Sequence, residues 1–408
     1  MSNDLIYYTL FPWENAYSSV SLSFTREFAK DNRVFYVNPP YTLKDLWSRR
    51  HEPLTQERRA DMLAGRTRYE RIPNMPDNVI GVQPPVVLPI NFLPKGKLYD
   101  TLHRRNSEVV FRAVEQVVEK YRLRDYIYLN CFNPFHGAVL PRPRFRPLLN
   151  VYQCIDDMYE EHYTAKHAAG IEEGEMAAAD VTLVTSRNLK KLKGVHNANT
   201  HVLHNAMEPK FFRKAIDETL PRPKELEGVT GKIIGFTGNI NGYRQDYELW
   251  RKIAVHHADK TLCMVGPLNS DDYQRVGLDQ LPNVILTGGK HISELPNYLQ
   301  HFDVTVIPFL KNRLTASVYP LKINEYLAAG KPAVCTNFSE DIQSFRRDVY
   351  LAENHDEFLH LIDRAIAEDD AEKRASRIET AYSNTWTDRV REFWEIVETS
   401  LENQPILA

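Results

Sequence analysis

Short apolar runs alternate with amphipathic segments along most of the chain, and this pattern predicts strands that alternate with helices. In the first half, the segment 19–30 places Val20, Phe24 and Phe28 on one face of a helix. The apolar runs predicted as strands lie at 5–10, 33–38, 78–83, 126–130, 149–154, 181–186 and 200–205. Strands separated by helices indicate a parallel sheet covered by helices.

A second series with the same rhythm begins after a mixed-charge stretch, 206–231, whose three prolines indicate an interdomain linker. Helices are expected at 247–257 and 292–300. Strands are expected at 232–240, 261–267, 283–290, 304–309 and 332–337, and only helices after them. The sequence therefore predicts an α/β protein with two parallel-sheet domains.

The C-terminal segment has an apolar stripe at helical spacing that needs a partner surface. Val390, Phe393, Trp394, Val397 and Leu401 form this stripe. We expect the helix to cross back onto the first domain. The predicted domains are 1–208, joined by the helix 385–408, and 209–384.

The stretch from Tyr41 to Arg71 interrupts the pattern because it is rich in arginine and other charged residues. We interpret it as an excursion from the first domain and expect it to be mobile.

Composition narrows the class of protein. A length of 408 residues favours two domains, and a net charge of −3 gives no indication of nucleic-acid binding. The four cysteines match no zinc or redox spacing, which predicts free core thiols in a reducing compartment.

The N-terminus has no secretory signal pattern. The longest uncharged run, 79–94, contains four prolines and is too short to span a membrane. We expect a cytoplasmic protein.

Two loops of the second half carry candidate ligand-binding residues. The stretch 232–240 is a strand that passes into a loop, where three glycines, at 235, 238 and 242, allow backbone amides to approach a phosphate, and Arg244 adds a cation. Their spacing differs from the dinucleotide fingerprint. Lys290 and His291 lie at the end of the strand at 283–290, where an ordinary strand-to-helix turn is the simpler interpretation.

The segment "YPLKINEYLAAGKPAV" (319–334) is more informative. Pro320 suits the first turn of a helix, and Gly330 and Pro332 end it. Lys322 and Glu325 lie three residues apart and could form a surface ion pair. Alternatively, Lys322 and the free helix amides bind a diphosphate while Glu325 accepts hydrogen bonds from a ribose diol.

Three stretches carry a family resemblance: "PLKINEYLAAGKPAV", "ELPNYLQHFDVTVIPF" and "VLHNAMEPKFF". They resemble family 4-like glycosyltransferases of the GT-B fold, which has two Rossmann-like domains that face a cleft. The nearest likeness is to bacterial enzymes of the teichuronic-acid type, which assemble surface polysaccharides. The resemblance covers most of residues 180–400.

The resemblance implies roles for individual residues. Glu325 matches the ribose-binding glutamate of the family, and Ser317 stands where the family has a second glutamate. It implies diphosphate contacts from Lys322 and Arg244, with Lys322 also catalytic. The remaining donor-binding residues that it implies are Gly238, Asn239, Lys290, His291, Thr315, Ser317 and Leu321.

The first half is expected to bind the acceptor. Asp156 and Asp157 follow the strand at 149–154, and either could act as a general base or cap a helix. Strand alternation favours Asp157 as the base. His136 and Glu14 are further acceptor-side candidates, although a single histidine is more often structural.

These observations predict a glycosyltransferase that moves a sugar from a nucleotide-sugar, with UDP implied by the resemblance. The acceptor is expected to be a carbohydrate or lipid-linked molecule. No metal and no cofactor are expected, and peripheral contact with the inner face of a membrane is a further expectation. A nucleotide-sugar epimerase of the same fold and a noncatalytic nucleotide- or carbohydrate-binding protein are the alternatives.

Overall fold

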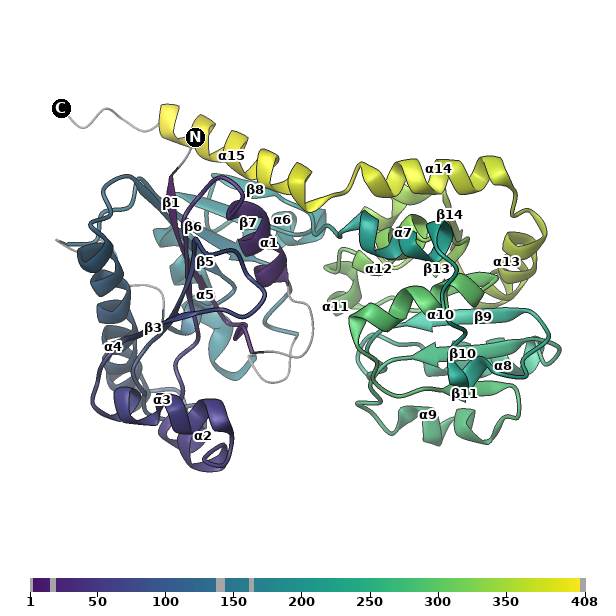
Figure 1. Ribbon diagram of the computed structural model, residues 1–408, viewed down its shortest axis with the longest axis horizontal. Helices are drawn as coiled ribbons and strands as arrows, with labels where there is room; N and C mark the ends of the chain where they lie inside the picture. The colour runs from purple at the N-terminus through teal and green to yellow at the C-terminus, as the bar shows by residue number, and fades with distance from the viewer. Residues whose placement is uncertain (1–2, 15–19, 137–143, 161–164, 404–408) are drawn as a thin grey trace. The chain divides into compact units, whose positions relative to one another are not determined.

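The computed structural model describes residues 3–14, 20–136, 144–160 and 165–403. The chain divides into two compact units (Figure 1). The first contains the chain up to Thr185 together with Leu189–Leu203 and the C-terminal helix from Val390. The second contains Ser186–Asn188 and His204–Arg389. This division falls near the predicted boundary at 208/209, which stays a prediction.

The first unit is built on a sheet of eight strands in the order β3-β4-β2-β1-β5-β6-β7-β8. All neighbours are parallel except β3, which pairs antiparallel with β4. The strands are β1 Asp4–Thr9, β2 Val34–Val37, β3 Arg68–Arg71, β4 Val79–Gln83, β5 Tyr126–Cys131, β6 Leu149–Cys154, β7 Val181–Val184 and β8 Thr200–Val202.

The second unit has six parallel strands in the order β11-β10-β9-β12-β13-β14. This is the doubly wound order: β9, β10 and β11 follow one another toward one edge of the sheet, and β12, β13 and β14 then follow one another toward the other edge. The strand order therefore reverses between β9 and β12. The strands are β9 Ile233–Thr237, β10 Thr261–Val265, β11 Val284–Leu286, β12 Val304–Ile307, β13 Ala333–Thr336 and β14 Val349–Ala352. The sequence analysis missed β14, because its four residues stand among charged neighbours.

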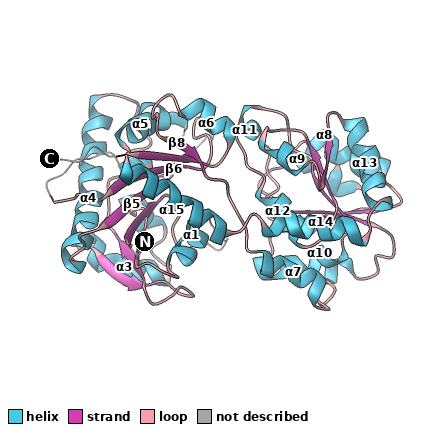
Figure 2. Ribbon diagram, turned by 90° about the horizontal axis from the view of Figure 1, so that it is seen from above, coloured by secondary structure: helices cyan, strands magenta, loops and turns pink. Residues whose placement is uncertain are grey.

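Helices cover both faces of each sheet (Figure 2). In the second unit, α8 and α13 pack together on one face, and α7, α10, α12 and α14 lie on the other. The principal helices are α1 Val20–Phe28, α2 Leu43–Ser48, α3 Pro53–Leu63, α4 Lys97–Tyr121, α5 Ala165–Ala178, α6 Arg187–Lys193, α7 Pro209–Asp217, α8 Tyr247–His256, α9 Asp272–Arg275, α10 Leu295–His301, α11 Arg313–Ala316, α12 Leu321–Ala328, α13 His355–Ala367, α14 Ala371–Tyr382 and α15 Trp386–Glu402.

The C-terminal helix α15 uses the apolar stripe that the sequence showed. Phe393 packs edge-on against Phe28 of α1, with ring centroids 4.9 Å apart, and Trp394 contacts the same ring. From Val390 onward the helix groups with the first unit. Residues 404–408 of the predicted segment lie outside the described residues.

The interpretation of residues 41–71 as a mobile excursion is wrong. The segment forms α2, α3 and the edge strand β3, so it completes the first sheet. Its charges pair with one another and with the rest of the unit. Arg58 is fully buried and forms ion pairs with Glu14 and Glu70. A charge-rich sequence can therefore be structural when its charges are paired.

The predicted linker also contains more structure than expected. Residues Pro209–Asp217 form α7, which buries Phe212 and Ala215 and contacts α10 and α12. The mixed charge of the stretch reflects the exposed face of this amphipathic helix.

Candidate functional site

The candidate donor site lies at the carboxyl end of β9 in the second unit. The strand order reverses between β9 and β12, and in open parallel sheets ligands bind outside the carboxyl ends of the strands at such a point. Gly238 directly follows β9, and its backbone φ of 146° lies in a region that favours glycine. A methyl group at this position would collide with the ammonium end of Lys322. Gly238 and Lys322, both predicted from sequence, are therefore in contact.

Helix α12 positions Lys322 and Glu325. Pro320 is the residue immediately before the helix, one position earlier than predicted, and Gly330, with φ 67°, ends it as expected. Thr237 anchors the helix to β9, because its backbone N–H donates to the Tyr326 hydroxyl at 2.9 Å. The first helical residue, Leu321, is half-buried.

Glu325 is 9% exposed, and among the described residues its carboxylate makes no hydrogen bond or ion pair. Burial raises the pKa of Glu325, and the nearby charge of Lys322 opposes that rise. The half-buried Lys322 likewise has no hydrogen-bond or ion-pair partner in the described chain, and its ammonium lies 5.9 Å from the centre of the Phe236 ring. A buried polar group without a partner is costly, so this pair indicates a site that a ligand completes.

The loop after β9 is held in place by backbone bonds to the segment after β12. Leu310 N–H donates to the Arg244 carbonyl at 2.9 Å, and Asp246 N–H donates to the Pro308 carbonyl at 2.9 Å. Asn239 accepts a hydrogen bond from Asn269 at 2.9 Å. The loop that contains Gly238, Asn239 and Arg244 is thus fixed beside the end of β12.

The other predicted donor contacts have internal partners. The Thr315 hydroxyl donates to backbone oxygens next to α11, and the Ser317 hydroxyl accepts from Asn188 at 2.9 Å. Both side chains are fully buried. Their contact with a donor sugar stays a prediction.

Lys290 and His291 follow β11, which is an edge strand of the sheet. Strand β10 lies between β11 and β9. Lys290 forms an ion pair with Glu225, whose pKa this contact lowers to about 2. His291 is exposed and accepts from the Ser293 backbone N–H at 3.3 Å, so it caps the turn that follows. Contact of either residue with a base stays a prediction.

In the first unit, Asp157, the residue favoured as the base, is buried, and its role as a base stays a prediction. Its side chain is 1% exposed and lies 3.3 Å from the ammonium of Lys193, which also binds Glu172 at 2.8 Å. The alternation of β6 does not continue past its end, and the buried Lys193 attracts the carboxylate inward. Asp156 is half-buried.

The two remaining acceptor-side candidates are also held by neighbours. Glu14 accepts from Asn38 at 3.1 Å and pairs with Arg58. Sequence analysis missed Arg58, because a single arginine in a charged segment carries no signal of burial. The ring of His136 stacks on that of His103, with ring centroids 6.3 Å apart. Burial lowers the pKa of His136 to about 3, so its ring is neutral near pH 7.

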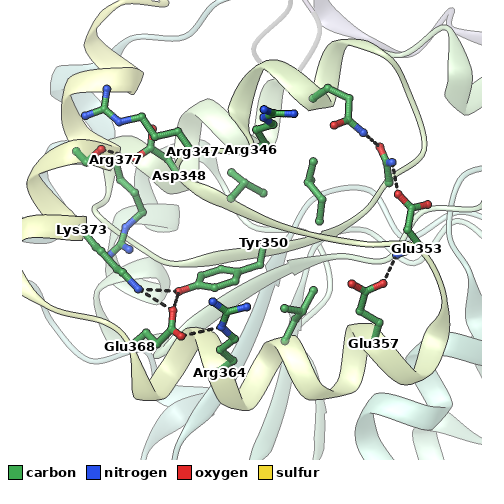
Figure 3. A pocket seen from close by; sticks show the side chains of 16 residues that line it. Arg346, Arg347, Asp348, Tyr350, Glu353, Glu357, Arg364, Glu368, Lys373 and Arg377 are labelled. Carbon is green, nitrogen blue, oxygen red and sulfur yellow. Dashed lines mark hydrogen bonds and ion pairs between the residues drawn. The ribbon is translucent and has the colours of Figure 1, made fainter.

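A pocket of about 590 Å³ beside β14 lies apart from these residues (Figure 3). Its central cations already have a partner, because Glu368 accepts from Arg364 and Lys373 as well as from Tyr350. No residue predicted from sequence lines it.

Comparison with known proteins finds a family match that contains the candidate donor site. Residues 231–368 match the family model described as Glycosyl transferases group 1. This stretch is therefore similar to a glycosyl transferases group 1 domain. The stretch contains the loop at Gly238 and both Lys322 and Glu325.

A sequence relative of the chain is "Putative teichuronic acid biosynthesis glycosyltransferase TuaH" of Bacillus subtilis (strain 168). The two are 32% identical over 151 residues, which is 37% of this chain and 37% of the relative. The match thus spans little more than a third of the relative's length. The predicted resemblance to teichuronic-acid-type enzymes is confirmed over that stretch.

Solved structures match nearly the whole chain in fold. A trehalose-6-phosphate structure from E. coli bound with UDP-2-fluoro glucose has a TM-score of 0.67 at 12% identity, covering 99% of this chain and 100% of that one. Sucrose-phosphate synthase from Thermosynechococcus elongatus has a TM-score of 0.67 at 14% identity, covering 98% and 100%. The chain has the GT-B fold, as predicted.

Proposed function

We propose that the protein is a glycosyltransferase that moves a sugar from a nucleotide-sugar to a carbohydrate or lipid-linked acceptor. The observation that carries this proposal is the pair of Lys322 and Glu325, which lies beside Gly238 at the sheet's reversal point and lacks partners among the described residues. The group 1 domain match and the teichuronic-acid relative support a role in surface-polysaccharide synthesis. UDP is the proposed nucleotide, because a fold relative is bound to a UDP-sugar.

In this proposal, Lys322 and the first amides of α12 stabilise the negative charge that grows on the departing diphosphate. Arg244 adds a second cation, and the loop of Gly238 and Asn239 lies next to the diphosphate. Glu325 accepts hydrogen bonds from the ribose hydroxyls. Cations take the place of a metal ion, so EDTA is expected to leave the rate unchanged.

The acceptor base belongs to the first unit. Asp156 suits this role better than Asp157, since Asp157 is buried against Lys193. The Asp156→Asn and Asp157→Asn variants separate the roles. Replacing the base should lower the rate without loss of stability, whereas replacing a structural carboxylate should lower stability.

Incubation with a panel of nucleotide-sugars, read by thermal shift and by product analysis, tests the function. A bound donor raises the melting temperature by mass action. We expect a UDP-sugar to do so and its sugar to be transferred or slowly hydrolysed. Acceptor-independent isomerisation of the donor would indicate an epimerase, and binding without any turnover would indicate a noncatalytic binding protein.

The chain has no helix, in the part that the structure describes, with the length and apolar character needed to cross a bilayer. A cytoplasmic location with peripheral contact at the inner face of a membrane is part of the proposal.

A further inference from the structure

Four large apolar side chains stand in solvent on one group of elements in the first unit. Leu43 and Trp47 on α2 are 44% and 71% exposed, Phe92 is 74% exposed, and Leu98 at the start of α4 is 63% exposed. We call these four residues the apolar rim. Single exposed apolar residues are ordinary, but a group of them indicates an interaction surface.

The rim residues belong together because their elements surround one pocket. This pocket, of about 370 Å³, is lined by the first turn of α2, by the segment 87–92 and by the start of α4. Phe92 itself lines it, as do Lys44 and Tyr99. The pocket also adjoins the ends of β1 and β5 through Leu10 and Asn133. Phe92 therefore lines a pocket at the carboxyl edge of the sheet, and the other rim residues belong to elements that line it.

The backbone holds the rim outward. Thr42 and Val87 form a parallel bridge, and Leu43 N–H donates to the Val87 carbonyl at 3.0 Å. Lys166 donates to the carbonyl of Phe92 at 3.0 Å. Phe92 is thus fixed at the tip of a hydrogen-bonded loop. Exposure at a fixed position costs hydration free energy that contact with an apolar phase would recover.

Several cations are close neighbours of the rim residues in the chain. Lys44, Arg50, Lys95 and Lys97 are all exposed, and the Arg50 guanidinium lies 4.8 Å from the centre of the Trp47 ring. Exposed aromatic rings interleaved with lysine and arginine are typical of surfaces that enter the headgroup region of a bilayer.

We propose that the apolar rim and its cations bind an anionic lipid bilayer, with Trp47 and Phe92 entering the headgroup region. This assignment deepens the proposed function, on which its biological meaning rests: a lipid-linked acceptor would then reach the pocket directly from the membrane surface. Contact with a second copy of the chain is less favourable, since a twofold interface sets the same patch against itself and would bring these cations together.

Vesicle flotation of the full chain tests the proposal without any sugar transfer. The probes are vesicles of pure phosphatidylcholine and vesicles of phosphatidylcholine with an equal part of phosphatidylglycerol. We expect binding to the anionic vesicles that weakens with added salt. The double variant Lys95→Glu/Lys97→Glu should reduce that binding roughly tenfold or more, because each lysine near an anionic surface contributes about fivefold.

The variant Trp47→Ser/Phe92→Ser should also lose binding, since it removes the inserting rings. Val195→Ser is the matched control, because Val195 is another apolar residue of the first unit, is 78% exposed and lies outside the rim. Melting temperatures check that every variant folds. Absence of vesicle binding by the natural chain, or equal binding by all variants, would overturn the proposal. A dimer that Trp47→Ser/Phe92→Ser dissociates, without lipid binding, would assign the surface to a second copy instead. Because flotation needs no donor, these outcomes are independent of whether the chain transfers sugar.

Discussion

The two units use the same kind of sheet, but their polar residues at the carboxyl ends of the strands have different environments. In the second unit, Lys322 and Glu325 have no hydrogen-bond or ion-pair partner among the described residues. In the first unit, Glu14 and Asp157 are paired with the buried cations Arg58 and Lys193. A polar residue at a strand end is therefore a candidate for ligand binding only when no buried partner already neutralises it.

The largest expected effect concerns the buried charges of the first unit. Lys193→Ala leaves Glu172 and Asp157 buried without a cation, which should cost about 3–5 kcal/mol of unfolding free energy. Urea denaturation measures this loss, and Lys190→Ala on the exposed side of the same helix is the control. Nucleotide affinity of the folded variant should be unchanged. A loss below about 1 kcal/mol would contradict the structural role of the network.

The opposite result is expected for Lys322→Ala. The turnover number should fall about 10²- to 10³-fold, because the cation acts on charge that develops in the transition state. The melting temperature should not fall, since no described partner loses a contact. Steady-state kinetics with Lys311→Ala as the exposed control measures the difference. An unchanged turnover number would remove Lys322 from the reaction.

Glu325→Ala should weaken nucleotide binding roughly 10- to 150-fold, the effect of losing hydrogen bonds to a charged group. Stability should be retained or increased, because the substitution removes a buried carboxyl group that has no partner. Titration calorimetry with the nucleotide measures the affinity, with Glu379→Ala on α14 as the control. Equal affinity in the natural chain and in Glu325→Ala would show that the ribose binds elsewhere.

The last expected effect appears as a slope of stability against pH rather than as a single loss. Burial raises the pKa of Glu175 on α5 to about 8, although Asn130 donates to it at 3.1 Å. The folded state therefore keeps a proton that the unfolded chain releases above about pH 4.5. Stability should fall as the pH rises from there to about 8, by at most about 1.4 kcal/mol per pH unit. Glu175→Gln, which stays neutral, should flatten the dependence of melting temperature on pH. A parallel curve for both proteins would contradict the raised pKa.

The sequence by itself determined the order of strands and helices, because apolar periodicity follows from burial on one or both faces of an element. It also pointed to Gly238, Lys322 and Glu325, through the glycines after a strand, the charges in the first turns of a helix and the resemblance of these stretches to a known family. β14 escaped prediction because its four residues stand among charged neighbours. The charged segment 41–71 was misinterpreted because composition alone cannot distinguish solvated charges from paired ones.

Tertiary structure decided which polar residues are structural. Arg58 and Glu14 are 44 residues apart in the chain, and Asp157 and Lys193 are separated by two intervening secondary-structure elements. The free energy of a buried charge depends on whether an opposite charge arrives from such a distant segment. The residues next to a charge in the sequence do not show which distant residue will pair with it. The role of Asp157, and the grouping of Trp47, Phe92 and Leu98 around one pocket, could therefore be seen only in the folded chain.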